Sequence, residues 1–172
     1  MASRAIQWVL VIAAIGIGSV DATRVRAKGD DRAALAAALR DTTATLQGGL
    51  KASEREGTPI SAKFEIGDGK LQLSVYTMKG DTYNEVVADP KTGAITEAEE
   101  IKDADDLKAA AAQKAAMAKA KVPLLTAAET AVKANPGSQA VSIYPQLQNG
   151  NAMAEVTLLQ GTTFKKVTEK LD

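Results

Sequence analysis

The sequence predicts an α+β protein made of two similar repeats, each a helix packed on an antiparallel β-meander of three to four strands. Two observations predict where the strands and helices lie. Segments that alternate apolar and polar residues are separated by glycine turns, and a helix-forming stretch with an apolar stripe precedes each set. A third observation indicates the repeat, because Ile60–Val86 can be overlaid on Val141–Val167 without a gap.

Residues 1–22 have the pattern of a secretory signal peptide, with Arg4 ahead of an uncharged run from Ala5 to Val20 and small residues after it. The run is shorter than the roughly 20 residues that cross a bilayer as a helix. We expect cleavage after Ala22, with a second workable site after Ala27; an uncleaved anchor is the other interpretation. A cysteine-free exported chain suits a periplasmic or secreted bacterial protein, without stable membrane insertion once the signal is removed.

The first repeat is expected over residues 30–101, and it opens with a helix capped by Asp30 or Asp31. Gly57 and Pro59 end this helix, and a kink is expected at Gly48-Gly49 because glycine is a poor helix former. Its apolar stripe consists of four leucines, Leu35, Leu39, Leu46 and Leu50.

The meander of this repeat is expected to have three strands, and the turn between the first two is Asp68-Gly69, a dipeptide typical of the type I′ hairpin turn. The following segment, Lys70–Met78, places apolar residues at every second position, as a half-buried strand does. Gly80 marks the next turn. The run Asp89–Gly93 turns the chain into a short fourth strand near Ala94–Thr96.

Residues 102–122 are expected to form an Ala-rich connecting helix. Aspartates gather at its N-terminal end and lysines towards its C-terminal end, which complements the helix dipole. Two interpretations stay open. The helix is either a spacer that joins or covers the repeats, or a helix that binds a partner.

The second repeat is expected over residues 123–172. Pro123 suits the start of its helix, and Asn135-Pro136-Gly137 ends it. Asn149-Gly150 and Gly161 repeat the two turns, but no fourth strand follows. The sequence leaves open whether the two repeats share one sheet or form separate units, and it does not give the oligomeric state.

The residue types that are missing exclude much chemistry. Without cysteine or histidine there is no thiolate nucleophile, no Ser–His triad and no imidazole metal site. With 21 basic and 21 acidic side chains the net charge is zero, which argues against nucleic acid as a partner. We therefore expect no enzyme, no metal and no cofactor. The aspartates considered as acid–base or calcium groups are better explained by turns and helix capping: Asp68, Asp81, Asp89, Asp103, Asp105 and Asp106.

Two aromatic residues, Tyr83 and Phe164, follow the equivalent glycine turns of the two repeats. If Val86 and Ala88 point to the core, Tyr83 lies on the opposite face of its strand. The pair is therefore a partner-binding hypothesis, since aromatic residues dominate interface energetics. The other interpretation is that the repeats pack through these rings. A sheet edge that accepts a partner's strand is a further possibility for binding.

The order of these motifs resembles the PepSY domain. The likeness rests on Leu71–Val75, Lys79-Gly80, and Glu85–Asp89 followed by Lys91-Thr92-Gly93. In the second copy it rests on Ala127–Ala134 with Asn135-Pro136-Gly137, and on Asn149–Val167. It covers roughly Leu35–Ile95 and Leu124–Leu171, and the second copy lacks the Asp-x-x-Thr-Gly close.

PepSY domains occur in the propeptides of thermolysin-type metallopeptidases and in exported bacterial proteins. The resemblance implies a non-catalytic binding module that modulates or inhibits a peptidase, or binds a ligand, in the cell envelope. Its expected partner is a peptidase or another envelope protein. The alternative is a structural or scaffold protein of the envelope without a peptidase target.

Overall fold

The computed structural model describes residues 31–67 and 69–172. The signal peptide, both of its expected cleavage sites, and Asp68 lie outside the described residues.

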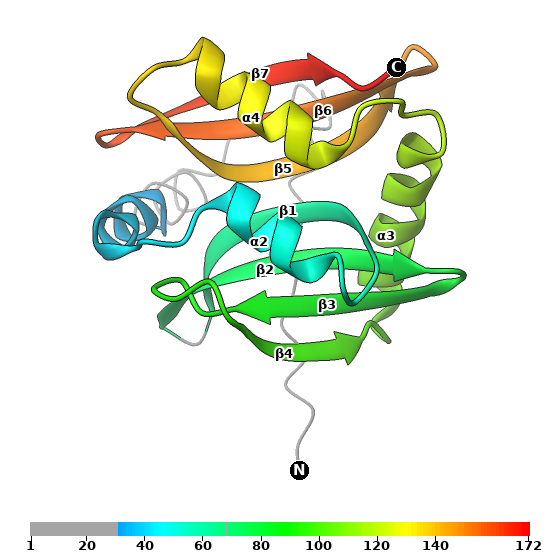
Figure 1. The fold of residues 1–172 in the computed structure, drawn as a ribbon, viewed down its shortest axis with the longest axis horizontal. Coiled ribbons are helices and arrows are strands. Elements are labelled where there is room, and N and C mark those ends of the chain that lie inside the picture. Colours follow the sequence, from blue (N-terminus) through cyan, green and yellow to red (C-terminus); the bar gives the residue numbers. More distant parts are fainter. Residues whose placement is uncertain (1–30, 68) are drawn as a thin grey trace, which may run out of the picture.

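Figure 1 shows the order of the elements along the chain. A helical segment over residues 31–38 leads into a 3-10 turn, η1 (Leu39–Asp41). The elements that follow are α2 (Leu46–Ser53), β1 (Thr58–Gly67), β2 (Lys70–Lys79), β3 (Thr82–Ala88), β4 (Ile95–Glu100), α3 (Ala104–Met117), α4 (Leu124–Ala134), β5 (Gln139–Gln148), β6 (Asn151–Gln160) and β7 (Thr163–Lys170).

All seven strands form one antiparallel sheet in the order β4-β3-β2-β1-β5-β6-β7. The two repeats therefore share a sheet, joined where β1 pairs with β5. In that pair Ala62 lies opposite Ile143, its own equivalent in the second repeat. Because β1 and β5 run in opposite directions and meet at equivalent residues, a local two-fold axis perpendicular to the sheet relates the two repeats.

The predicted α+β fold with two helix-plus-meander halves is confirmed. β1 and β5 have equivalent bounds at the offset of the sequence repeat, and so do β2 and β6. Even the irregularities match, because the register shift between Pro59 and Ser61 recurs between Ala140 and Ser142.

The hairpin turns follow the predicted chemistry. Asn149 and Gly150 have φ values of 52° and 84°, the two positive values that a type I′ turn needs. Gly69 has φ 73° at the equivalent place in the first repeat.

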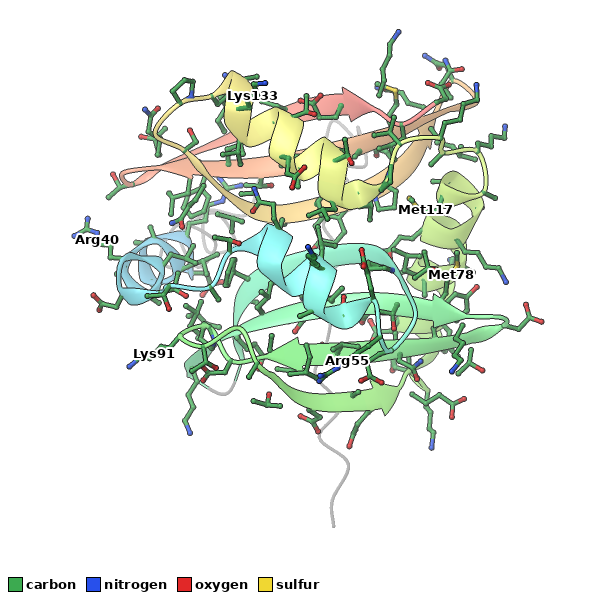
Figure 2. The ribbon with its side chains drawn as sticks, in the orientation of Figure 1. Arg40, Arg55, Met78, Lys91, Met117 and Lys133 are labelled. Atoms are coloured by element: carbon green, nitrogen blue, oxygen red, sulfur yellow. The ribbon has the colours of Figure 1, made fainter. Side chains whose placement is uncertain are left out.

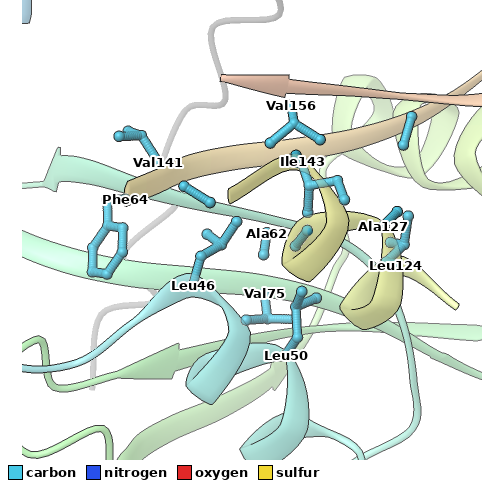
Figure 3. Packing of buried hydrophobic residues seen from close by; sticks show 14 of the residues in the cluster. Leu46, Leu50, Ala62, Phe64, Val75, Leu124, Ala127, Val141, Ile143 and Val156 are labelled. Atoms are coloured by element: carbon cyan, nitrogen blue, oxygen red, sulfur yellow. The ribbon is translucent and has the colours of Figure 1, made fainter. Parts of the chain in front are cut away.

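Helices cover the sheet on both faces. Val75 and Tyr76 follow each other in β2, so they point to opposite faces. Val75 belongs to a core that includes Leu50 of α2 and Leu124 of α4, as Figure 3 shows. Tyr76 belongs to a smaller cluster with Ala110 of α3. The connecting helix α3 therefore covers part of the second face of the sheet, where it contacts β1, β5 and β6.

The single helix expected before β1 is wrong. The chain is extended between η1 and α2, and the hydroxyls of Thr42 and Thr43 donate to the carbonyls of Pro90 and Lys91. The Thr45 hydroxyl then caps α2 by accepting from the Gly48 amide at 3.0 Å. β-branched residues that bond backbone elsewhere compete with a helix.

The two glycines lie inside α2, which continues through both of them. Gly49 lies inside the helix, and a Cβ there would come within 2.4 Å of Leu73 Cδ2, so the glycine lets the helix approach the sheet closely. The fourth strand is also longer than expected, running from Ile95 to Glu100.

Candidate functional site

A groove of about 580 Å³ opens where α2 ends and α4 begins. Its apolar lining comes from five different elements, α2, β1, β2, α3 and α4, and Met78 and Met117 lie at the right of Figure 2. The apolar members are Leu50, Pro59, Met78, Met117, Pro123, Leu124 and Leu125. Glu54, Arg55 and Lys79 supply charged side chains at the same site. Methionine thioethers suit an adaptable apolar surface, because the side chain is unbranched and polarisable.

The loop after α2 forms one wall of the groove, and a glycine determines its path. Gly57 has φ 155°, and a Cβ on it would lie 2.7 Å from the carbonyl oxygen of Met78. Only a glycine lets the loop backbone lie this close to the end of β2. The preceding helix ends at Ser53, whose buried hydroxyl donates to the Leu50 carbonyl at 2.9 Å.

The start of α4 forms the opposite wall. Leu46, the first residue of α2, is equivalent to Ala127 in the second repeat, so α4 begins three residues earlier than α2 does. The extra turn brings Leu124 and Leu125 to the groove. Pro123 precedes it with φ −60° and ψ 149°, the extended geometry of a helix N-cap.

The equivalent place in the second repeat is built differently. Leu159 replaces Met78 and is only 3% exposed, whereas Met78 is half-buried. Gln160 replaces Lys79, and its side-chain amide donates to the Pro136 carbonyl at 3.4 Å. Pro136 itself replaces Arg55. The two repeats share their strands and turns but differ at this corner, where the first repeat gains two cations and an accessible thioether.

The two cations at the groove differ in whether they form an ion pair. Arg55 pairs with its neighbour Glu56 at 3.1 Å. Lys79 is exposed and makes no ion pair with any residue in the described part of the chain. An occupant with an acidic group beside an apolar one would therefore match this groove.

The two aromatics predicted to bind a partner do not line the groove. Both rings are half-buried rather than exposed, and each lies beneath a cation. The Arg32 guanidinium is 5.7 Å from the centroid of Phe164, and the Lys114 ammonium is 5.9 Å from that of Tyr83. Tyr83 packs against the cluster of Tyr76, on the face opposite Val86, as strand parity predicts.

Lys114 also anchors α3 to the turn between β2 and β3. Its ammonium donates to Asp81 Oδ1 at 2.8 Å and to the Gly80 carbonyl at 3.1 Å. The hydrogen bond between them lowers the pKa of Asp81 and raises the pKa of Lys114. Asp81 is thus a partner of the connecting helix.

Asp89 and Asp103 take the structural roles expected of them. Asp89 Oδ1 accepts from the amides of Lys91 and Thr92 at 3.0 and 2.8 Å, and these bonds lower the pKa of Asp89. Asp103 caps α3 by accepting from the amides of Asp105 and Asp106. Among residues 31–67 and 69–172, no group of acidic side chains is arranged to hold a metal ion.

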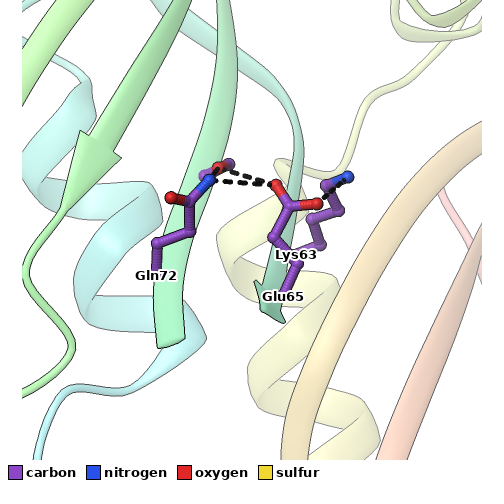
Figure 4. A network of polar contacts seen from close by, with 4 residues as sticks. Lys63, Glu65 and Gln72 are labelled. Carbon is purple, nitrogen blue, oxygen red and sulfur yellow. Dashed lines mark hydrogen bonds and ion pairs between the residues drawn. The ribbon is translucent and has the colours of Figure 1, made fainter. Parts of the chain in front are cut away.

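Sequence reasoning missed a polar cluster on the α3 face of the sheet, shown in Figure 4. Glu65 lies 2.5 Å from the Lys63 ammonium and accepts from the Ser74 hydroxyl at 3.0 Å and from the Gln72 amide at 3.4 Å. Period-2 alternation places Lys63 and Glu65 of β1 on the face opposite Ala62 and Phe64. It could not show that α3 also partly covers this second face.

Glu85 belongs to the same cluster through Ser74, with which it shares a hydrogen bond. Burial is the main reason that the pKa of Glu85 rises to about 7, and the nearby Glu65 carboxylate raises it further. Burial also raises the pKa of Asp106, which shares a hydrogen bond with Tyr76. Such a shifted carboxyl marks either a functional group or a structural one.

Within the described residues no helix is both long and apolar enough to cross a membrane.

No protein-family model matches the chain, and no curated protein matches it. Among solved structures, the chain is similar to a candidate lipoprotein from Clostridium difficile 630. The two are 14% identical with a TM-score of 0.40, over 71% of this chain and 80% of that one. A likeness at this level carries no inference about function.

Proposed function

We propose that the protein is an exported, non-catalytic binding module whose groove receives an apolar segment of a partner protein in the cell envelope. The observation that supports this is the difference between the repeats. Their strands and turns coincide, yet only the first repeat combines an accessible Met78 with Lys79 and Arg55 at this corner. The repeated fold does not require this difference, because the second repeat forms the same strands and turns without it.

The chemistry of the groove limits the kind of segment. Apolar side chains would displace water from the half-buried Met78, Met117 and Leu125, which contributes roughly 25 cal/mol for each Å² buried. An acidic side chain next to them would pair with Lys79. The resemblance to PepSY domains makes a peptidase, or a protein that works with one, the first class of partner to test.

Selection from a phage-displayed library of random short peptides tests the proposal without a known partner. The protein is purified from the periplasmic fraction of a bacterial host. We expect enrichment of peptides that carry an acidic residue beside apolar ones. Leu125→Glu places a charge in the apolar lining and should weaken binding of the selected peptides at least about tenfold, as the loss of a binding hot spot does.

A matched pair of variants separates the groove from general charge effects. Lys79→Glu should weaken binding of the same peptides, whereas Gln160→Glu places the same carboxylate at the equivalent position outside the groove and should leave binding unchanged. Melting curves show that each variant is folded. Equal binding by Lys79→Glu, Gln160→Glu and the unaltered protein would remove the groove as the site.

A further inference from the structure

The two edge strands of the sheet carry opposite charge. β4, which has the sequence ITEAEE, holds Glu97, Glu99 and Glu100 and no cation. β7, which has the sequence TFKKVTEK, holds Lys165, Lys166 and Lys170 with one glutamate. Figure 1 shows these strands at opposite edges of the molecule. All six of these side chains belong to exposed residues.

The charges also lie on matching faces. In β4, Glu97 and Glu99 pair with Val87 and Glu85, so they lie on the α3 face of the sheet. In β7, Lys166 and Lys170 pair with Thr157 and Met153, which lie on that same face. Lys166 is partly engaged, because it forms an ion pair with Glu155 at 2.5 Å. Lys170 makes no ion pair within the described part of the chain.

Both edges have backbone groups directed outwards. The Ile101 amide donates inwards to Tyr83, so by strand alternation the amides of Ala98 and Glu100 point away from β3. The Leu171 amide donates inwards to Ala152, so those of Lys166, Thr168 and Lys170 point away from β6. Such rows of unpaired groups are a template for another strand.

We propose that these edges bind each other, so that β7 of one copy pairs with β4 of the next and copies associate head to tail. In the antiparallel order, β4 and β7 run in the same direction, so a copy displaced within the plane of the sheet adds a parallel strand pair. Glu99 then faces Lys170, and Glu97 lies diagonally between Lys166 and Lys170, within reach of long side chains. Two β4 edges, or two β7 edges, would instead place like charges together.

Pairing between the two edges would lead to assembly of many copies, which binding at the groove would not. A heterologous contact does not close on itself unless its rotation closes a ring, so it produces chains of copies. Such chains would serve the scaffold alternative, and they use no residue of the groove.

Sedimentation of the protein, purified after export, tests the proposal at low and high salt. We expect the average mass to rise with protein concentration at low salt and to fall when salt screens the edges. Glu97→Lys with Glu99→Lys makes both edges basic, and Lys166→Glu with Lys170→Glu makes both acidic. Each should weaken association at least about tenfold because like charges then meet. An equimolar mixture of the two should associate again, because each acidic edge then finds a basic one.

Ala98→Pro tests the backbone part of the contact. It removes an outward amide from an edge strand, where proline is tolerated, and keeps every charge. We expect association to be lost while the melting temperature stays within a few degrees. A wild-type protein that stays monomeric at low salt, reversal variants that associate as it does, or undiminished association of folded Ala98→Pro would each overturn the proposal.

Discussion

Glu85 shows how a single residue links burial to stability in this protein. Its carboxyl is held in the polar cluster with a pKa of about 7, against 4.5 for an exposed glutamate. Because the pKa of Glu85 is higher in the folded protein, its carboxyl keeps the proton at pH values at which the unfolded chain has already lost it. The stabilisation is complete below about pH 4.5 and is lost as pH rises through about 7.

We therefore expect the free energy of unfolding to fall by up to about 3 kcal/mol between pH 5 and 8, because over most of that interval the unfolded chain has lost the Glu85 proton while the folded protein still holds it. Urea denaturation across that interval measures it. Glu85→Gln should flatten the profile, whereas Glu99→Gln, the exposed neighbour across the strand pair, should not. A profile that is unchanged in Glu85→Gln would show that the carboxyl is not the titrating group. Asp81 and Asp89 titrate at lower pH and do not enter this interval.

At the scale of elements, the loop between α2 and β1 depends on Gly57. Gly57→Ala should lower the free energy of unfolding by about 1–2 kcal/mol or more, because a side chain is strained at this φ and would meet the Met78 carbonyl. Thermal melting measures the loss. Ser138 occupies the equivalent position in the second repeat, and Ser138→Ala should stay within about 0.5 kcal/mol. If both variants melt alike, the loop is not constrained as described.

The elements also show how far sequence reasoning reaches. Turn dipeptides and period-2 alternation located the strands of both repeats, since these signals are local. The break at Thr42–Thr45 was missed because its cause is distant, in the carbonyls of Pro90 and Lys91. The groove was missed for a similar reason. It arises from the three-residue difference in where α2 and α4 begin, which becomes visible only when both helices lie on one sheet.

At the scale of the whole molecule, the seam between β1 and β5 makes the repeats one unit. The main core contains residues of both repeats, and Ile143 is fully buried at the seam. Sequence could not predict this pairing, because Ala62 and Ile143 have the same alternation as residues of any other buried strand face.

Ile143→Ala should lower the free energy of unfolding by about 2–5 kcal/mol through lost burial and a cavity. Because the core is shared, the protein should still unfold in a single transition, which calorimetry can test. Two transitions, with only one moved by the substitution, would mean that the repeats fold as separate units.

The most direct test of the groove is amide chemical-shift mapping by NMR with the most enriched peptide from the library. If the groove is the binding site, the largest shifts will fall on Arg55, Lys79, Gly80 and Leu125. The amides of the equivalent corner, those of Gly137, Gln160 and Gly161, should stay unchanged. Shifts confined to that second corner, or to the β7 edge, would contradict the assignment of the binding site to the first repeat.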